Sequence, residues 1–323
     1  MRRILALLLC LVAVPAQGLL AGPARAAWPD RPITLIVPFS PGGGADIAGR
    51  SMGRWLEARL GQPVVVVNRP GAGGAIGFAA TAQAAPDGHT IGVVTLPNLV
   101  TIPIERRAGY TVDQLALIAN LVDDVGGVFV RADSRFRSMA DLVAAARRDP
   151  GAVSFGTTGV GTYAHLGMLA LERQAGISLT AVAYGSTAPM RAALLQGELQ
   201  VGGLSMTDAT QEMAAGTLRP LGQMAAERWP GTPEVPTLRE QGFDVVLSSL
   251  RGFAAPAGTP PAILRRLSDL VGEAARDPGF RALAEKQAMP LGYQDSAAFA
   301  AGIAGMRAQY ERLWREQPWR ERD

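Results

Sequence analysis

Residues 33 to 46 read Ile33-Thr34-Leu35-Ile36-Val37-Pro38-Phe39-Ser40-Pro41-Gly42-Gly43-Gly44-Ala45-Asp46. The run Ile33 to Val37 predicts a buried strand that is followed by a glycine-rich loop and then by a helix. Glycine lets backbone N–H groups crowd inward, and the first N–H groups of a helix have no acceptor within that helix. The helix dipole favours negative charge at the same end. The stretch therefore predicts an anion-binding loop for a carboxylate or a phosphate.

The first 26 residues have the composition of a cleavable export signal. Arg2 and Arg3 precede an apolar segment from Ile4 to Val14, and Ala24-Arg25-Ala26 forms a small-x-small cleavage site. We expect cleavage near Ala26 and a periplasmic mature chain. The apolar segment is shorter than the roughly 20 residues that span a bilayer, so an uncleaved anchor is the less favoured alternative.

Cleavage would also change the charge of the protein. Removing Arg2, Arg3 and Arg25 from the 31 basic residues leaves 28, which equals the 28 acidic residues. A chain that is close to neutral gives no reason to expect nucleic acid as a partner. The one cysteine, Cys10, lies in the signal, so the mature chain has no thiol for a disulfide, a nucleophile or a metal site.

Apolar runs alternate with helix-period segments along the rest of the chain, a pattern typical of α/β folds with mostly parallel strands. The first helix has Asp46 as its expected N-cap and Gly61 as its expected C-cap. A second series begins near Gly127 with a strand at residues 128–131. It repeats the order of strand, glycine loop and helix around residues 152–170. Two such loops in different halves of the chain predict two lobes that face one cleft.

Common catalytic and nucleotide-binding motifs are missing from the sequence. It has no Walker loop, and the dinucleotide glycine spacing fails at Ile76. Residues Gly49 to Gly53 match Gly-x-Ser-x-Gly, but they lie within the first predicted helix and not at a strand-to-helix elbow. We interpret His89 as a surface residue. His165 is expected to hold the second glycine loop, with ligand contact as the second interpretation and general-base work as the least favoured one. This profile favours a binding protein over an enzyme.

Three further polar residues are candidates for the cleft. Asp46 is favoured as a helix cap over a ligand or an acid catalyst. Tyr184 ends a predicted strand, so its hydroxyl is a candidate to point into a cleft. Asp208 lies on a predicted strand-to-helix turn.

Several segments occur in a characteristic order: Trp28 to Ile33, Val37 to Asp46, Gly61 to Gly74, Ala85 to Thr90, Gly156 to Gly161 with His165-Leu166, Glu234 to Leu238, and Ala255 to Pro260. Together they span nearly the whole mature chain. This order resembles the Bug (TctC-like) family, the extracytoplasmic solute receptors of tripartite tricarboxylate transporters.

The resemblance implies an α/β, two-lobed periplasmic binding protein fold, type II-like, with a mainly parallel sheet flanked by helices in each lobe. It implies a signal peptide at residues 1–26, a first lobe of residues 27–125 plus 251–323, and a second lobe of residues 126–250. The lobes would close by a hinge motion, as a Venus flytrap, over a small organic carboxylate held mainly by backbone N–H groups and water. A monomer that delivers this ligand to an integral membrane permease is expected, without a catalytic residue, a metal, a cofactor or nucleic acid.

The resemblance also implies which residues contact the ligand. In the first lobe these are Phe39, Ser40, Pro41, Gly42, Gly43, Gly44, Ala45 and Asp46, with Gly73, Gly74 and Thr95 nearby. In the second lobe they are Thr157, Thr158, Gly159, Gly161, Thr162 and His165, with Tyr184 closing the site. We add Asp208 to this set as a further candidate.

The sequence departs from the family pattern at two places. Tyr184-Gly185-Ser186 replaces the usual Tyr-Lys-Gly, so a positive charge near the cleft is lost. Leu250-Arg251-Gly252 stands where the family usually has an aromatic residue, often Trp. Arg251 either supplies a cation for a second carboxylate or faces solvent, and solvent is the favoured interpretation. Dicarboxylates, tricarboxylates, amino acids and aromatic acids all fit the same loops.

Two other functions are compatible with parts of this pattern. The same fold can present its ligand to a sensor kinase, and neighbouring permease or two-component genes would discriminate uptake from sensing. An exported hydrolase is the less favoured alternative, and turnover of a bound ligand would support it.

Overall fold

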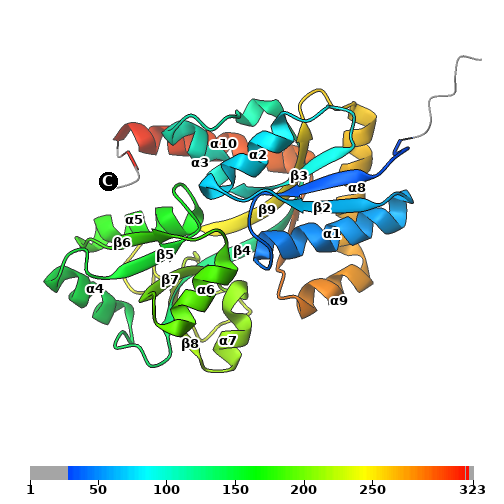
Figure 1. Ribbon diagram of the computed structural model, residues 1–323. Helices are drawn as coiled ribbons and strands as arrows, with labels where there is room; N and C mark the ends of the chain where they lie inside the picture. Colours follow the sequence, from blue (N-terminus) through cyan, green and yellow to red (C-terminus); the bar gives the residue numbers. More distant parts are fainter. Residues whose placement is uncertain (1–27, 317, 320–323) are drawn as a thin grey trace, which may run out of the picture.

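The protein, described here by a computed structural model of residues 28–316 and 318–319, forms two groups of strands and helices (Figure 1). The expected signal peptide at residues 1–26, with its cleavage site and Cys10, lies outside the described residues. One sheet runs through both groups in the order β2-β1-β3-β9-β4-β7-β5-β6, and β8 and β10 also pair with β4. Within the described residues, none of the helices has the length and apolar character needed to cross a bilayer.

The elements have the following bounds. The strands are β1 (Ile33–Val37), β2 (Val64–Asn68), β3 (Thr90–Leu96), β4 (Leu115–Arg131), β5 (Ser154–Thr157), β6 (Thr180–Ala183), β7 (Val201–Ser205), β8 (Leu218–Gln223), β9 (Ser248–Pro256) and β10 (Leu291–Gln294). The α-helices are α1 (Gly44–Leu60), α2 (Ala75–Ala82), α3 (Asn98–Glu105), α4 (Met139–Arg148), α5 (Tyr163–Ala175), α6 (Thr187–Gln196), α7 (Thr210–Ala214), α8 (Pro261–Arg276), α9 (Pro278–Lys286) and α10 (Ser296–Glu316).

The first group is built on the parallel strands β2, β1 and β3. The predicted apolar run supplies β1, and Leu35 is fully buried in its core. Met52 and Leu56 lie one helical turn apart on α1 and are buried in the same cluster. Gly61 ends α1 in the left-handed conformation, with a φ of 67°, which confirms the predicted C-cap.

The second group repeats this arrangement with β5 as its central parallel strand. Phe155 of β5 lies opposite Ala181 of β6 and Val201 of β7. Phe155 is fully buried together with Leu142 of α4 and Leu171 of α5, so helices pack against this part of the sheet as they do in the first group. The same local order therefore occurs in both halves of the chain, as the sequence predicted.

Two long strands, β4 and β9, connect the groups (Figure 1). Residues 115–125 of β4 pair antiparallel with β9, whereas residues 126–131 pair antiparallel with β7 and β8. The sequence predicts a strand only at residues 128–131. The rest of β4 gives no strand signal, because most of it is buried and lacks a polar alternation. The lobe boundaries near residues 125 and 251 stay a prediction; the first lies where β4 exchanges partners, and the second lies within β9.

Candidate functional site

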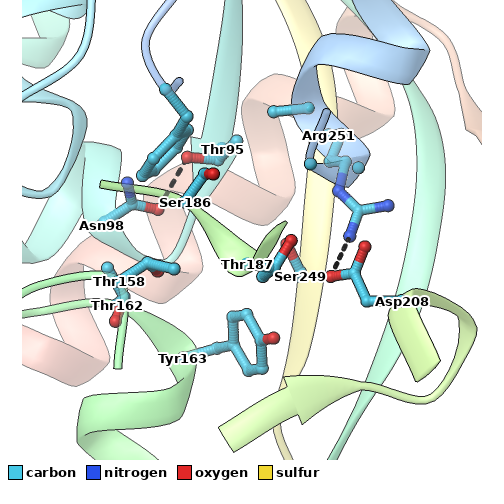
Figure 2. Close-up of a pocket in the computed structure, with 14 residues that line it drawn as sticks. Thr95, Asn98, Thr158, Thr162, Tyr163, Ser186, Thr187, Asp208, Ser249 and Arg251 are labelled. Carbon is cyan, nitrogen blue, oxygen red and sulfur yellow. Dashed lines mark hydrogen bonds and ion pairs between the residues drawn. The ribbon is translucent and has the colours of Figure 1, made fainter. Parts of the chain in front are cut away.

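An inner cavity lies between the two groups of elements, at the carboxyl ends of several strands (Figure 2). Its lining residues are Phe39, Gly43, Gly44, Ala45, Thr95, Asn98, Thr158, Thr162, Tyr163, Ser186, Thr187, Asp208, Ser249 and Arg251. Ligand sites of open α/β sheets are usually found at this edge, where loops follow the strands. The inner cavity is therefore the candidate site.

The first glycine loop brings the N-terminus of α1 to the inner cavity. Gly43 is the N-cap, with extended backbone, and α1 begins at Gly44. The predicted N-cap, Asp46, was wrong by three positions, because the glycine supplies the extended conformation and the carboxylate lies in the first turn. Gly43, Gly44 and Ala45 all line the cavity. The Asp46 N–H donates to the Gly43 carbonyl at 2.9 Å, whereas the N–H groups of Gly44 and Ala45, at the start of the helix, are available to an anion.

Asp46 holds the shape of this loop. Its Oδ2 accepts hydrogen bonds from the Gly42 N–H at 3.0 Å and from Arg50 Nε at 2.9 Å. Its Oδ1 accepts one from Asn68 Nδ2 at 2.9 Å. Burial raises the pKa of Asp46, but the hydrogen bonds from Arg50, Asn68 and Gly42 outweigh burial, so its pKa lies below the ordinary value. The carboxylate therefore stays ionised and acts on loop structure.

The second glycine loop brings the N-terminus of α5 to the same cavity. The N-cap is Thr162, whose Oγ1 donates to the Gly159 carbonyl at 2.7 Å. The Gly161 N–H donates to His165 Nδ1 at 3.3 Å. This contact agrees with the favoured interpretation of His165 as a residue that holds the loop. Both helices therefore present their positive ends to one space.

The two groups contact each other around the inner cavity. The Ser40 N–H donates to the Gly185 carbonyl at 3.3 Å, and Thr101 Oγ1 donates to the Gly161 carbonyl at 2.6 Å. A Cβ atom on Gly159 would lie 2.9 Å from the Cα atom of Gly73. Only glycine permits this approach between the two loops.

Neutral polar side chains cover much of the inner cavity. Figure 2 shows Thr95 and Asn98 joined by a hydrogen bond, from Thr95 Oγ1 to Asn98 Oδ1 at 2.8 Å. Asn98 Nδ2 in turn donates to the Gly73 carbonyl at 2.6 Å. The Ser186 side chain also lines the cavity, and its buried Oγ has no hydrogen-bond partner among the described residues. Because buried polar atoms are normally satisfied, Ser186 Oγ is available to a ligand.

Arg251 lies in the sheet and not at the surface. Only 5% of its side chain is exposed, and its Nη2 lies 2.8 Å from Asp124 Oδ2. The favoured prediction that Arg251 faces solvent is therefore wrong, because β9 crosses the middle of the sheet, between β3 and β4. Burial opposes the charge of Arg251, but Asp124 and Asp208 outweigh burial and keep its pKa above the ordinary value. Burial raises the pKa of Asp124.

An outer cavity adjoins the inner one and shares Phe39 and Thr158 with it. Its lining residues are Phe39, Gly71, Ala72, Gly73, Gly74, Arg106, Thr158, Gly159, Val160, Ala183, Tyr184 and Gly185. Tyr184 thus lies at the outer cavity and is absent from the lining of the inner one. Residues of the second glycine loop line both spaces, with Thr158 common to the two.

The predicted contact residues fall into three sets. Phe39, Gly43, Gly44, Ala45, Thr95, Thr158, Thr162 and Asp208 line the inner cavity. Gly73, Gly74, Gly159 and Tyr184 line the outer cavity. Ser40, Pro41, Gly42, Asp46, Thr157, Gly161 and His165 line neither of these two cavities. Their role as ligand contacts stays a prediction, and Pro41 and Gly42 are exposed.

Sequence reasoning missed several lining residues, namely Asn98, Tyr163, Ser186, Thr187 and Ser249. Ser186 and Thr187 follow β6 just as the glycine loops follow β1 and β5, so the strand-end rule would have found them. Asn98 begins α3, a helix that the local sequence does not predict. In the described part of the chain, no cluster of three or more His, Cys, Asp or Glu side chains is arranged to hold a metal ion.

His89 differs from its predicted surface position, because only 7% of the residue is exposed. Its Nε2 lies 3.0 Å from Asp30 Oδ1, and its Nδ1 lies 3.4 Å from Asp87 Oδ1. The Trp28 ring packs edge-on against it at 6.3 Å. The N-terminal segment thus covers this histidine, which local sequence around the Pro86-Asp87-Gly88 turn did not indicate.

Comparison of the sequence with known proteins identifies one family. The profile described as "TctC: Tripartite tricarboxylate transporter family receptor" matches residues 49–317. A protein of Pseudomonas sp. (strain P51), described as a UPF0065 protein in the tcbD-tcbE intergenic region, is 38% identical over 261 residues, which cover 78% of this chain and 76% of the relative. Protein BugT of Bordetella pertussis is 34% identical over 278 residues, which cover 85% of each chain.

Solved structures agree with the sequence comparison. The periplasmic binding protein BugD has a TM-score of 0.83 and 27% identity, with 90% of this chain and 98% of that chain covered. MatC from Rhodopseudomonas palustris with bound malate has a TM-score of 0.84 and 25% identity, with 88% and 99% covered. An R. palustris protein with adipate has a TM-score of 0.84 and 26% identity, with 89% and 97% covered. The predicted periplasmic binding protein fold is confirmed, and the chain belongs to the TctC family of tripartite tricarboxylate transporter receptors.

Proposed function

We propose that this protein binds a small organic carboxylate in the inner cavity and delivers it to a membrane permease of the tripartite tricarboxylate type. One observation carries the proposal: the N-termini of α1 and α5, one from each group of elements, face one cavity lined by hydroxyl groups. Aligned helix N-termini favour an anion. The solved structures of relatives with malate and adipate support a carboxylate as that anion.

The backbone supplies enough binding energy without a dedicated cation. A hydrogen bond to a charged group contributes about 1.5–3 kcal/mol, and a micromolar complex corresponds to about −8.2 kcal/mol. A carboxylate that accepts N–H groups from both first turns, with Ser186 Oγ and Thr158 nearby, reaches this range. Loop geometry therefore matters more for affinity than any single side chain.

Binding is coupled to closure of the two lobes, at residues 27–125 plus 251–323 and at residues 126–250. The strands β4 and β9 serve as the hinge, because β4 pairs with strands of both groups and β9 returns the chain from the second group to the first. Contacts such as Ser40 N–H to the Gly185 carbonyl belong to the closed form. The permease then receives the closed, loaded receptor in the periplasm, after removal of residues 1–26.

A thermal-shift screen tests ligand binding. The panel contains monocarboxylates, dicarboxylates, tricarboxylates and amino acids, each with the matching primary alcohol or amide as a control. A ligand that binds only the folded chain at one hundred times its Kd adds about 2.7 kcal/mol of stability, and Tm rises accordingly. We expect a rise for at least one carboxylate and for none of the uncharged controls. An equal rise with the controls, or no rise at all, would contradict the proposal.

Uptake by cells tests delivery. Deletion of the gene should abolish uptake of the radiolabelled ligand found in the screen. The full chain should restore uptake, and a chain that starts at residue 27 should not. Unchanged uptake in the deletion strain would contradict the role in transport while leaving carboxylate binding intact.

A further inference from the structure

A small apolar cluster joins the two groups of elements beside the second glycine loop. Its buried members are Val160, Leu166, Tyr310 and Trp319, with exposed fractions between 3% and 9%. Val160 and Leu166 belong to the second group, whereas Tyr310 lies on α10 and Trp319 follows the end of α10. We call these four residues the strap cluster. It buries side chains from both lobes against each other.

The helix α10 anchors the strap cluster in the first lobe. Phe299 and Ile303, near the start of this helix, are buried together with Leu99 of α3. A helix of 21 residues is about 30 Å long, so its far end lies well beyond that core. In Figure 1 the red end of α10 extends past α3 on the side where α5 lies. There the Trp319 ring packs edge-on against the Tyr310 ring at a centroid distance of 5.9 Å.

The second lobe has a core that is distinct from the strap cluster. This core includes Met168 and Leu171 of α5, and Leu171 is 1% exposed. Leu166 lies on the same helix but is buried in the strap cluster. Five residues correspond to a rotation of about 140° around a helix, so Leu166 and Leu171 point to different sides of α5. The burial of Leu166 therefore depends on the first lobe, whereas the burial of Leu171 depends on the second lobe alone.

The strap cluster is continuous with the second glycine loop. Val160 lies between Gly159 and Gly161, and it also lines the outer cavity. The carbonyl of Gly161 accepts the hydrogen bond from Thr101 Oγ1 of the first lobe at 2.6 Å. A hinge motion that breaks this contact also pulls Val160 away from Trp319. Opening of the cavity therefore exposes apolar surface of the strap cluster to water.

We infer that Leu166 and Trp319 are positioning residues, which hold the second glycine loop in the closed form of the receptor and keep part of the unliganded population closed. The inference rests on the proposed function, in which the lobes close over the ligand. Apolar surface that is buried only when the lobes are together stabilises the closed form. Ligand affinity falls with the fraction of closed protein. The strap cluster therefore raises affinity, although none of its members lines the inner cavity.

Calorimetric titration of two leucine variants on α5 tests the inference. The probe is malate or, if malate does not bind the unmodified chain, the carboxylate of the thermal-shift screen that raises Tm most. Leu166→Ala should raise Kd at least about tenfold, which is about 1.4 kcal/mol. The matched control, Leu171→Ala, removes the same atoms from the core of the second lobe. It should lower Tm but leave Kd within about twofold, because distant sites without shared partners act independently.

The variant Leu166→Met separates packing from other effects of substitution at this position. Methionine fills nearly the same volume as leucine, so Kd should return most of the way to that of the unmodified chain. A Kd of Leu166→Ala no higher than that of Leu171→Ala would overturn the inference. A Kd of Leu166→Met as high as that of Leu166→Ala would also overturn it, because apolar packing would then not be the cause.

A distance measurement follows closure itself and needs no ligand. The chain that begins at residue 27 has no cysteine, because Cys10 is the one cysteine of the sequence. Spin labels are attached to Arg107→Cys, just after α3, and to Arg173→Cys on α5, which are both exposed positions. In the unliganded chain, Leu166→Ala should shift the distribution of label distances toward longer values, and Leu171→Ala should not. An unchanged distribution in Leu166→Ala would overturn the inference even if Kd rises.

The two measurements also separate this inference from the proposed function. If the unmodified chain binds no carboxylate, the proposed function is contradicted, and the label distances still decide the role of the strap cluster. If carboxylates bind and the two leucine variants have equal Kd values and equal distances, the strap cluster has no role in closure and carboxylate binding stands.

Discussion

Replacing Gly43 with valine places a side chain in the contact between the two lobes. A Cβ atom on Gly43 would lie 3.0 Å from Thr187 Oγ1 and 3.4 Å from Ser186 Cβ. The φ of −91° and ψ of 170° at Gly43 are ordinary for any residue, so the backbone accepts the substitution. The added atoms therefore act on the approach of the β6–α6 loop and have little effect on the first lobe alone.

The size of the effect follows from packing. Extra carbon atoms in a packed contact cost about 1–3 kcal/mol, here only when the lobes are together. Because ligand affinity is reduced by the fraction of closed protein that is lost, Kd should rise about 5- to 150-fold. The Tm of the free protein should change little, apart from a small loss of helix-cap preference at Gly43.

Calorimetric titration with the tightest ligand of the carboxylate panel, together with thermal unfolding of the free protein, measures both quantities. The matched control is Gly305→Val on α10, where an added Cβ meets nothing within 4 Å. It should leave Kd and Tm close to those of the unmodified chain. If Gly43→Val binds as tightly as the control, the lobes do not close over the ligand as described and the reasoning is refuted.

Three further substitutions test other parts of the account. Gly44→Ala places a methyl group against the face of the Arg251 guanidinium, and this overpacking costs about 1–3 kcal/mol. The higher helix propensity of alanine offsets only about 1 kcal/mol of that cost, so Tm should fall. A Tm equal to or above that of the unmodified chain would contradict this. Asp46→Asn should lower Tm most above about pH 5, and the Tm difference from the unmodified chain should shrink below about pH 4. The reason is that the pKa of Asp46 is lowered in the folded chain. Such a carboxylate stabilises the fold above its ordinary pKa of about 3.9 and loses this effect as pH falls through the lowered value. A difference that is independent of pH would exclude this role for the carboxylate. Trp319→Ala removes a ring that is 3% exposed and packs against the Tyr310 ring at a centroid distance of 5.9 Å. Urea unfolding should therefore show that the free energy of unfolding falls by about 3–5 kcal/mol. A fall of less than about 1 kcal/mol would show that this pair of rings is not part of the core.

The parts of the fold that sequence predicts are those with strong local signals. The apolar run at Ile33 to Val37 and the helical spacing of Met52 and Leu56 fix the first strand and helix. Glycine at position 61 marks the helix end, because a left-handed residue without a Cβ costs nothing there. The loop from Gly156 to Thr162 has the same order of strand, glycine loop and helix in the second half of the chain. The sequence alone therefore predicts both glycine loops that line the cleft.

The parts that sequence does not predict depend on distant pairing. β4 has little polar alternation, so its full length becomes evident only from its pairing with β9, β7 and β8. Arg251 is buried because Asp124, far away in sequence, provides its counterion, and the local Leu-Arg-Gly context gives no sign of this. His89 is covered by Trp28 for the same kind of reason. Local sequence therefore does not predict the burial of a charged or polar residue whose partners lie far away along the chain.

The most direct test of the central claim is calorimetric titration of the chain that begins at residue 27 with the carboxylate panel. The account predicts saturable binding of one ligand per chain, at micromolar Kd or tighter, for at least one small carboxylate. The same titration with its uncharged alcohol or amide analogue should give no heat of binding. Titrations without saturable binding for every carboxylate, or equal affinity for the uncharged analogue, would contradict the account.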